Sequence, residues 1–295
     1  MLSTRKSALI LAQITFVAIV PAAHAADNKS TTLTYLALGD SVAFGLNPYL
    51  LPPISNQKPS PNQFTGYPEI IGQVERLPSS REVNASCPGE TSASFLSDTV
   101  TDLNPDNGCR SPHLQLPAPL PPFKTAVGLH TNYAGSQMAF AISQLTSNKG
   151  YNLVTLNIGS NDVLLALALC KGDLACAGPQ FPAILDSFAG NLTTILMKIR
   201  AVYSGKLVLV TYYAPTPEFD SLAQGLNQVI VGVGKPFGVE FADGYNAFRL
   251  VASLFGGDAC KAGLVYRLPD GTCDVHPTPA GQGLLAGAVE LAMHH

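Results

Sequence analysis

The first residues that could carry out chemistry lie in "TYLALGDSVAFG" (residues 34–45), where an apolar, β-prone stretch ends at Gly39, Asp40 and Ser41. A serine becomes a nucleophile only where a base takes its proton and hydrogen-bond donors stabilise the oxyanion that forms on the attacked carbonyl. Without those partners, Gly, Asp and Ser are simply residue types that favour turns. The rest of the sequence must therefore supply a base and oxyanion donors.

The base would be a histidine, and three of the six histidines are candidates. One of the others lies in a leader that we expect to be removed, and two lie at the carboxyl terminus, which we expect to fray. The candidates are His113, His130 and His276. His276 lies in "CDVHPTPAGQG" and precedes the last predicted helix, so we expect it on a loop at the edge of the sheet. An ordinary loop residue is the alternative for His130 and His276.

The oxyanion donors would be backbone NH groups at a strand-to-helix turn, or a side-chain amide at a strand end. Gly89 lies in "ASCPGETS", after the second predicted strand, and Asn161 lies in "NIGSND", just after the third. Taken singly, a Pro-Gly pair is a common turn and an Asn after a strand is often a helix cap. Both residues would share with Ser41 the edge of a parallel sheet at which ligands bind.

Alternating strands and helices would position these residues. Short β-rich runs occur at residues 33–38, 81–84, 153–158, 206–213 and 239–242. Helical patterns occur at residues 66–76, 135–147, 181–203, 221–233 and 280–294. This alternation predicts an α/β fold, in which a five-stranded parallel sheet is covered by helices on both faces. The runs "LVTLNI" and "KLVLVTYY" are apolar at their cores, which is typical of strands buried on both faces.

Three irregular stretches, residues 47–63, 105–122 and 164–179, follow the carboxyl ends of the first three predicted strands. The first two are rich in proline, and the third holds two cysteines. Because ligands bind at this edge of open α/β sheets, we interpret the stretches as walls of a cleft. Linkers between domains are the alternative.

Composition limits the partners. The chain has 295 residues, of which 46% are hydrophobic and 13% charged, and its net charge is -3. It has no basic run, so we expect no nucleic-acid partner. The length suits one α/β domain or two small ones, and we expect one domain over residues 26–295 and a monomer.

Residues 1–25 are typical of a secretory signal peptide, in which a basic start precedes an apolar stretch and small residues allow cleavage after Ala25. A membrane anchor is the alternative, but polar residues interrupt a stretch shorter than the ~20 apolar residues of a spanning helix. We therefore expect a secreted protein, extracellular or periplasmic, without a stable membrane span.

Six cysteines lie in the mature chain, and an even number in a secreted protein favours disulfides. The sequence allows 15 pairings. Pairing of neighbours would close three loops, over residues 87–109, 170–176 and 260–273. Metal ligation is the alternative, but the chain has no Cys-x-x-Cys pair, and an oxidising compartment disfavours thiolate sites. The cysteines are Cys87, Cys109, Cys170, Cys176, Cys260 and Cys273.

Four blocks together resemble the SGNH, or GDSL-type, hydrolase family over nearly the whole mature chain. They are "LALGDS" with Ser41, "CPGETS" with Gly89, "IGSND" with Asn161 and "DVHPT" with His276, in the family's order. The resemblance implies a three-layer, flavodoxin-like α/β sandwich and an esterase or lipase that needs no cofactor or metal. It also implies that Ser41 is the nucleophile, that His276 is its base, and that Asp40 holds the turn. The oxyanion hole would comprise the NH groups of Ser41 and Gly89 and the amide of Asn161.

One position departs from the family's pattern. Members commonly place an acid three residues before the histidine, where this chain has Cys273, whereas Asp274 stands two residues before it. Either the Asp274 carboxylate orients the imidazole, or a backbone carbonyl near Cys273 does so and Ser41 and His276 act as a dyad. We favour Asp274, because a carboxylate also stabilises the imidazolium that forms.

Two other functions stay open. A secreted binding protein could have this fold without turnover, because a fold does not determine a function. A metal-dependent phosphoesterase could use the Asp-x-His pair of Asp274 and His276, but that pair comes last in the chain, and no His-rich cluster completes a two-metal site.

Few residues bear on the substrate. The segment "DVLLALALC" (residues 162–170) offers an apolar wall beside Asn161 that would suit an acyl chain, and a helix packed into the core is the alternative. Tryptophan is absent, and no aromatic pair is typical of a sugar platform. These features favour simple or lipid esters over carbohydrate esters.

Overall fold

Five parallel strands form the central sheet, in the order β2-β1-β3-β4-β5. The computed structural model describes residues 33–101, 105–112 and 121–294. The signal peptide predicted for residues 1–25, the start of the domain predicted for residues 26–295, and His113 lie outside these ranges. The strands are β1 (Tyr35–Gly39), β2 (Glu82–Asn84), β3 (Leu153–Asn157), β4 (Lys206–Val210) and β5 (Glu240–Ala242).

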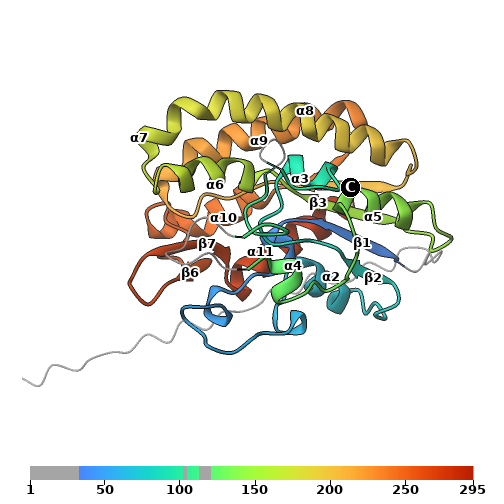
Figure 1. Cartoon of the computed structure of the whole chain (residues 1–295), viewed down its shortest axis with the longest axis horizontal. Coiled ribbons are helices and arrows are strands. Elements are labelled where there is room, and N and C mark those ends of the chain that lie inside the picture. Colours follow the sequence, from blue (N-terminus) through green and yellow to red (C-terminus); the bar gives the residue numbers. More distant parts are fainter. Residues whose placement is uncertain (1–32, 102–104, 113–120, 295) are drawn as a thin grey trace, which may run out of the picture. The chain divides into compact units, whose positions relative to one another are not determined.

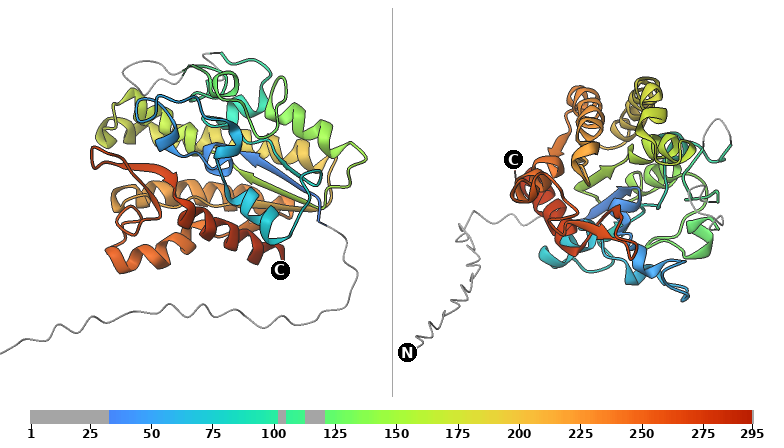
Figure 2. Two further views of the ribbon diagram at one scale, coloured as in Figure 1. Left: turned by 90° about the horizontal axis from the view of Figure 1, so that it is seen from below. Right: turned by 90° about the vertical axis from the view of Figure 1, so that its left-hand side faces the viewer.

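Helices cover both faces of this sheet, as Figures 1 and 2 show, and the predicted three-layer α/β fold is confirmed. One face carries α5 (Gln137–Leu145), α8 (Phe181–Arg200) and α9 (Asp220–Gly234), and the other carries α2 (Tyr67–Val74), α10 (Gly244–Ala252) and α11 (Pro279–Met293). The shorter helices are α1 (Ser41–Phe44), α3 (Ser92–Leu96), α4 (Phe123–Ala126), α6 (Ser160–Leu169) and α7 (Leu174–Ala177). No helix in the described ranges is both long and apolar enough to cross a membrane.

The sheet forms the core because its middle strands are apolar on both faces. All five residues of β1, "YLALG", and of β3, "LVTLN", are buried. Helix α8 adds a row of buried side chains spaced three or four residues apart, which is the spacing of one helix face. The carboxyl ends of the strands are thereby held in one rigid layer.

The structure differs from the sequence-based expectation in two places. His276 does not lie on a loop, because it belongs to β7 (Cys273–Pro277), which pairs with β6 (Val265–Arg267) in an antiparallel hairpin. The stretch predicted to be irregular over residues 164–179 is largely helical, in α6 and α7. Leu and Ala are strong helix formers, and they make up most of this stretch.

Three disulfides join neighbouring cysteines along the chain. They are Cys87–Cys109, Cys170–Cys176 and Cys260–Cys273. The first joins the loop after β2 to the segment over residues 105–112, the second closes the connection between α6 and α7, and the third holds the first residue of β7. The first two disulfides therefore fasten segments that follow β2 and β3, and the third fastens the hairpin that carries His276.

Candidate active site

Ser41 stands at the carboxyl end of β1, where a glycine and an aspartate turn the chain into α1. Gly39 has φ 145°, and a Cβ atom there would lie 2.3 Å from the carbonyl oxygen of Asn157. Only glycine therefore fits between β1 and β3. Asp40 caps α1, because its Oδ1 accepts a hydrogen bond from the backbone NH of Val42 at 2.9 Å. This turn therefore determines the position of the Ser41 backbone, from which the side chain extends.

The second carboxylate oxygen of Asp40 also faces the protein interior. It accepts hydrogen bonds from Ser160 Oγ at 2.7 Å and from the Tyr212 hydroxyl at 2.5 Å. Complete burial raises the pKa of Asp40, and the three hydrogen bonds act against that shift. Asp40 thus ties the turn to the ends of β3 and β4.

The imidazole ring of His276 is hydrogen-bonded to Ser41 at one nitrogen and to an acid at the other. Its Nε2 lies 2.9 Å from Ser41 Oγ, and its Nδ1 lies 2.5 Å from Asp274 Oδ1. The same carboxylate oxygen accepts the backbone NH of His276 at 2.8 Å. Burial acts to raise the pKa of Asp274, but the nearby His276 and these hydrogen bonds outweigh burial, so that the pKa is lowered. Serine, imidazole and carboxylate are therefore arranged so that a proton could pass from Ser41 to His276.

The hairpin of β6 and β7 holds His276 in place. The Cys260–Cys273 disulfide fastens the start of β7, and the Tyr213 hydroxyl donates to the carbonyl of Val275 at 2.5 Å. After the strand, the NH of Thr278 donates to the carbonyl of Leu264 at 2.9 Å. The backbone is therefore held in place both before and after His276.

The loop after β2 brings Gly89 beside Asn161. Gly89 has φ 85°, and a Cβ atom there would lie 2.2 Å from the carbonyl oxygen of Asn107, so another residue would collide with backbone. Asn161 Nδ2 donates to the carbonyl of Glu90 at 3.1 Å, while its Oδ1 accepts from Asn107 at 3.1 Å. The amide group has a second hydrogen. That hydrogen and the NH groups of Ser41 and Gly89 have no partner within the described part of the chain.

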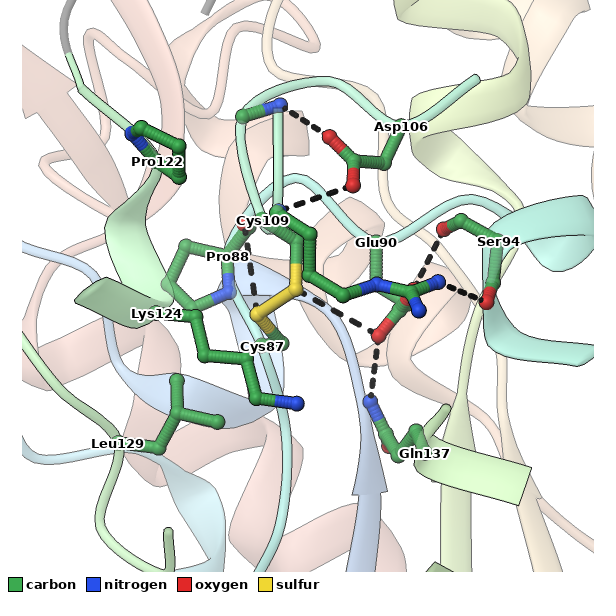
Figure 3. Close-up of a disulfide and its surroundings, with 12 residues drawn as sticks. Cys87, Pro88, Glu90, Ser94, Asp106, Cys109, Pro122, Lys124, Leu129 and Gln137 are labelled. Atoms are coloured by element: carbon green, nitrogen blue, oxygen red, sulfur yellow. Dashed lines mark hydrogen bonds and ion pairs between the residues drawn. A yellow bond between two sulfur atoms is a disulfide. The ribbon is translucent and has the colours of Figure 1, made fainter. Parts of the chain in front are cut away.

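A buried network, which the sequence did not reveal, links this loop to the turn of Ser41. Figure 3 shows the part of it in which Glu90 contacts Gln137 and Ser94. Gln137 accepts the NH of Gly39 at 2.6 Å and donates both to the Gly39 carbonyl at 2.9 Å and to Glu90 at 3.3 Å. Ser94 donates to the other Glu90 oxygen at 2.5 Å. The only sequence signal is that Gln137 opens the buried face of an amphipathic helix.

The remaining histidine candidate lies elsewhere. His130 Nε2 is 3.1 Å from the carbonyl oxygen of Phe44, and its ring packs against the Phe44 ring with centroids 4.5 Å apart. Burial lowers the pKa of His130 despite this hydrogen bond. His130 therefore supports the end of α1 and does not replace His276 as the partner of Ser41.

Comparison with known proteins identifies the family. A model of the GDSL-like lipase/acylhydrolase family matches residues 37–284. The chain belongs to this family. No curated protein sequence matches the chain.

The solved structures that share this fold include an esterase and a putative lipase. An acetylxylan esterase from Geobacillus stearothermophilus has 15% identity and a TM-score of 0.50, over 88% of this chain and 94% of its own. A putative GDSL-like lipase from Parabacteroides merdae has 14% identity and a TM-score of 0.50, over 89% of this chain and 96% of its own. At these identities the similarity shows the fold alone. Membership of the family supports the function of an ester hydrolase.

Among the described residues, the groups of side chains that lie close enough to share a metal ion do not include Ser41, Asp274 or His276. Both imidazole nitrogens of His276 are hydrogen-bonded, one to Ser41 and one to Asp274. Three groups that do lie so close occur in the described part of the chain. Two of these groups contain disulfide cysteines, and the third comprises Glu75, Glu290 and His294.

Proposed function

We propose that the chain is a secreted serine esterase or lipase that hydrolyses carboxylic esters through an acyl-enzyme on Ser41. The observation that carries the proposal is the 2.9 Å approach of His276 Nε2 to Ser41 Oγ, with Asp274 on the opposite ring nitrogen. A nucleophile next to a base that a third group orients is the arrangement that activates a serine.

The reaction begins when neutral His276 removes the proton of Ser41 Oγ as this oxygen attacks the ester carbonyl. The oxyanion that forms accepts hydrogen bonds from the NH groups of Ser41 and Gly89 and from Asn161 Nδ2. His276 then gives its proton to the leaving alcohol. In the second half, His276 takes a proton from a water molecule that attacks the acyl-enzyme. The bond from the acyl carbon to Ser41 Oγ then breaks, His276 returns the proton to Ser41 Oγ, and the carboxylic acid leaves.

Asp274 serves as the third member of the proposed catalytic triad, together with Ser41 and His276. Its pKa is lowered in spite of burial, so it stays ionised while His276 becomes an imidazolium. It also selects the tautomer with a proton on Nδ1, which leaves Nε2 free to accept the proton of Ser41. Asp274→Asn keeps the shape and removes the charge, and we expect a loss of about 1000-fold or more in kcat. A loss below about tenfold would favour the dyad instead.

Secretion is supported by the predicted signal peptide and by the three disulfides, which form in oxidising compartments. We propose a monomeric mature protein that begins near residue 26 and acts on small-molecule or lipid esters. The amino-terminal sequence of protein recovered from the periplasm or medium tests the cleavage site.

Hydrolysis of p-nitrophenyl acetate by the wild type, by Ser41→Ala and by EDTA-treated protein tests the activity. We expect turnover that survives EDTA and that the Ser41→Ala substitution abolishes. Equal turnover by Ser41→Ala would refute the serine mechanism. Loss of turnover on EDTA treatment would favour a metal-dependent enzyme, and no turnover in any sample would favour a binding protein.

A further inference from the structure

An apolar cleft begins at Ser41 and runs between α6 and α9. The empty space in and above it measures about 630 Å³, which includes space open to solvent. Helix α6 contributes Val163, Leu164 and Leu167 to the lining, and α9 contributes Leu222 and Leu226. We infer that this cleft binds the acyl chain of the ester, and that the substrates are esters of linear fatty acids longer than acetate. The inference rests on the acyl-enzyme proposed above.

The cleft suits a hydrocarbon chain because its hydroxyl groups are already engaged. Four hydroxyl-bearing residues line it, and each one is hydrogen-bonded within the protein. Ser160 and Tyr212 bond to Asp40, Tyr213 bonds to a backbone carbonyl, and Ser41 bonds to His276. A sugar in this cleft would lose hydrogen bonds to water without replacement, whereas an alkyl chain loses none.

The site geometry assigns the cleft to the acyl chain and not to the alcohol. Gly89, Asn161 and His276 do not belong to the lining of the cleft, whereas Val275 does. The carbonyl oxygen must face Gly89 and Asn161, and the leaving oxygen must face His276, because that residue protonates it. The remaining substituent of the carbonyl carbon is the acyl chain, and it therefore takes the cleft. An acyl chain held there stays bound while the alcohol leaves.

Leu222 belongs to the wall that α9 contributes to the cleft. It also lines a second cavity, together with Leu174, Phe181 and Leu185 from the segment of α7 and α8. One half-buried leucine thus lines both the apolar cleft and this second cavity, whose lining also includes Glu218 and Ser221. A smaller side chain at position 222 would join these spaces, and a larger one would fill the first.

The wild type is tested on p-nitrophenyl acetate, butyrate, hexanoate and octanoate, each below the concentration at which it forms micelles. We expect kcat/KM to rise at least about tenfold from acetate to octanoate, since each methylene that leaves water contributes up to roughly fourfold. Ethyl, butyl and octyl acetates vary the alcohol instead, and we expect their kcat/KM values to agree within about threefold, because the alcohol faces out of the cleft.

Two substitutions at one position and a matched control test the wall. Leu222→Trp should lower the octanoate-to-acetate ratio of kcat/KM at least about fivefold, and Leu222→Ala should shift the preferred ester to decanoate or longer. Leu169→Trp places the same bulk on the exposed face of α6, where the leucine is 73% exposed and outside the cleft, and should keep the wild-type ratio. If Leu222→Trp does not fold, the shift in Leu222→Ala decides the matter.

The outcomes separate this inference from the proposed function. Wild-type activity that depends on Ser41 but falls beyond acetate overturns the acyl assignment and leaves the esterase standing. Activity that rises with the alcohol chain instead of the acyl chain overturns the assignment too. Equal hydrolysis by Ser41→Ala overturns the proposed function, and the inference with it.

Discussion

On the side of Ser41 that faces β2, polar groups are buried and hydrogen-bonded, whereas on the side that faces β4 the surroundings are apolar and partly open. Glu90 and Gln137 on the polar side are at most 1% exposed, and directional bonds connect them to the turn of Ser41. On the apolar side, α6 and α7 form a small hydrophobic cluster of their own, separate from the main core.

The difference matches what each side is proposed to do. An oxyanion needs donors that are fixed before charge develops, because donors that must reorient lose part of the stabilisation. An alkyl chain needs only apolar surface, since hydrophobic burial is non-directional and scales with area. The polar side should therefore control kcat for every ester, and the apolar side should control the preference among esters.

The largest expected effect is on the polar side. Asn161→Ala removes one proposed oxyanion donor, and we expect kcat to fall roughly 100- to 1000-fold. The fall should be equal for acetate and octanoate esters in steady-state assays, because both share the same carbonyl. A fall confined to octanoate would contradict the division between the two sides.

The next largest effect concerns the two disulfides beside the site, which should differ in how much they stabilise the fold. Loop closure gives about 3 kcal/mol for the 22-residue separation of Cys87 and Cys109, and about 2 kcal/mol for the 6-residue separation of Cys170 and Cys176. Urea unfolding of the two Cys→Ala double variants measures both values. Loss of Cys87–Cys109 should also lower kcat for every ester, whereas loss of Cys170–Cys176 should change the chain-length preference. The reverse result would contradict the division of roles between the polar and the apolar side.

Gln137→Met should have a smaller effect, again on the polar side. The substitution keeps the volume but removes the bonds to Gly39 and Glu90, so the turn and the oxyanion loop lose their direct link. We expect kcat to fall about tenfold, with KM and the chain-length ratio unchanged, because Gln137 positions other groups. A variant that loses stability but keeps full kcat would show that the link is only structural.

The smallest effect concerns the pH dependence of stability. Burial raises the pKa of Glu90 to about 7, although Ser94 and Arg110 act against it. A carboxyl with a raised pKa in the folded state contributes its full stability below its unfolded pKa and loses it as the pH rises through the folded value. The window is therefore roughly pH 4.5 to 7.

We expect Tm to fall by a few degrees between pH 5 and pH 8, and three more glutamates with pKa values of about 7 share this sign. Glu90→Gln should remove part of the fall. Calorimetry that finds a higher Tm at pH 8 than at pH 5 would contradict the buried carboxyl on the polar side.

Local sequence patterns were sufficient to predict the sheet and the meeting of four motifs. Ser41, Gly89 and Asn161 each follow a predicted strand, and parallel strands bring such ends to one edge. The hairpin that carries His276 was missed because β7, "CDVHP", contains an aspartate and a proline, which are depleted in strands. The bonds of Gln137 to Gly39 span 98 residues, and no local pattern indicates which buried amide meets which backbone.

For helix α6, sequence-based prediction was limited in a different way. Its sequence is apolar nearly all round, so periodicity could not separate a helix in the core from the wall of a cleft. The structure gives it both contacts, since Val163 and Leu167 belong to the small cluster and also line the cleft.

Covalent trapping tests the central claim, that Ser41 is a nucleophile activated by His276. The protein is treated with a p-nitrophenyl alkylphosphonate, and its peptides are mapped by mass spectrometry. We predict one phosphonate adduct per chain, on the peptide that contains Ser41, with complete loss of esterase activity and at least about 100-fold slower labelling of His276→Ala. Full activity after treatment, or an adduct on another residue, would contradict the account.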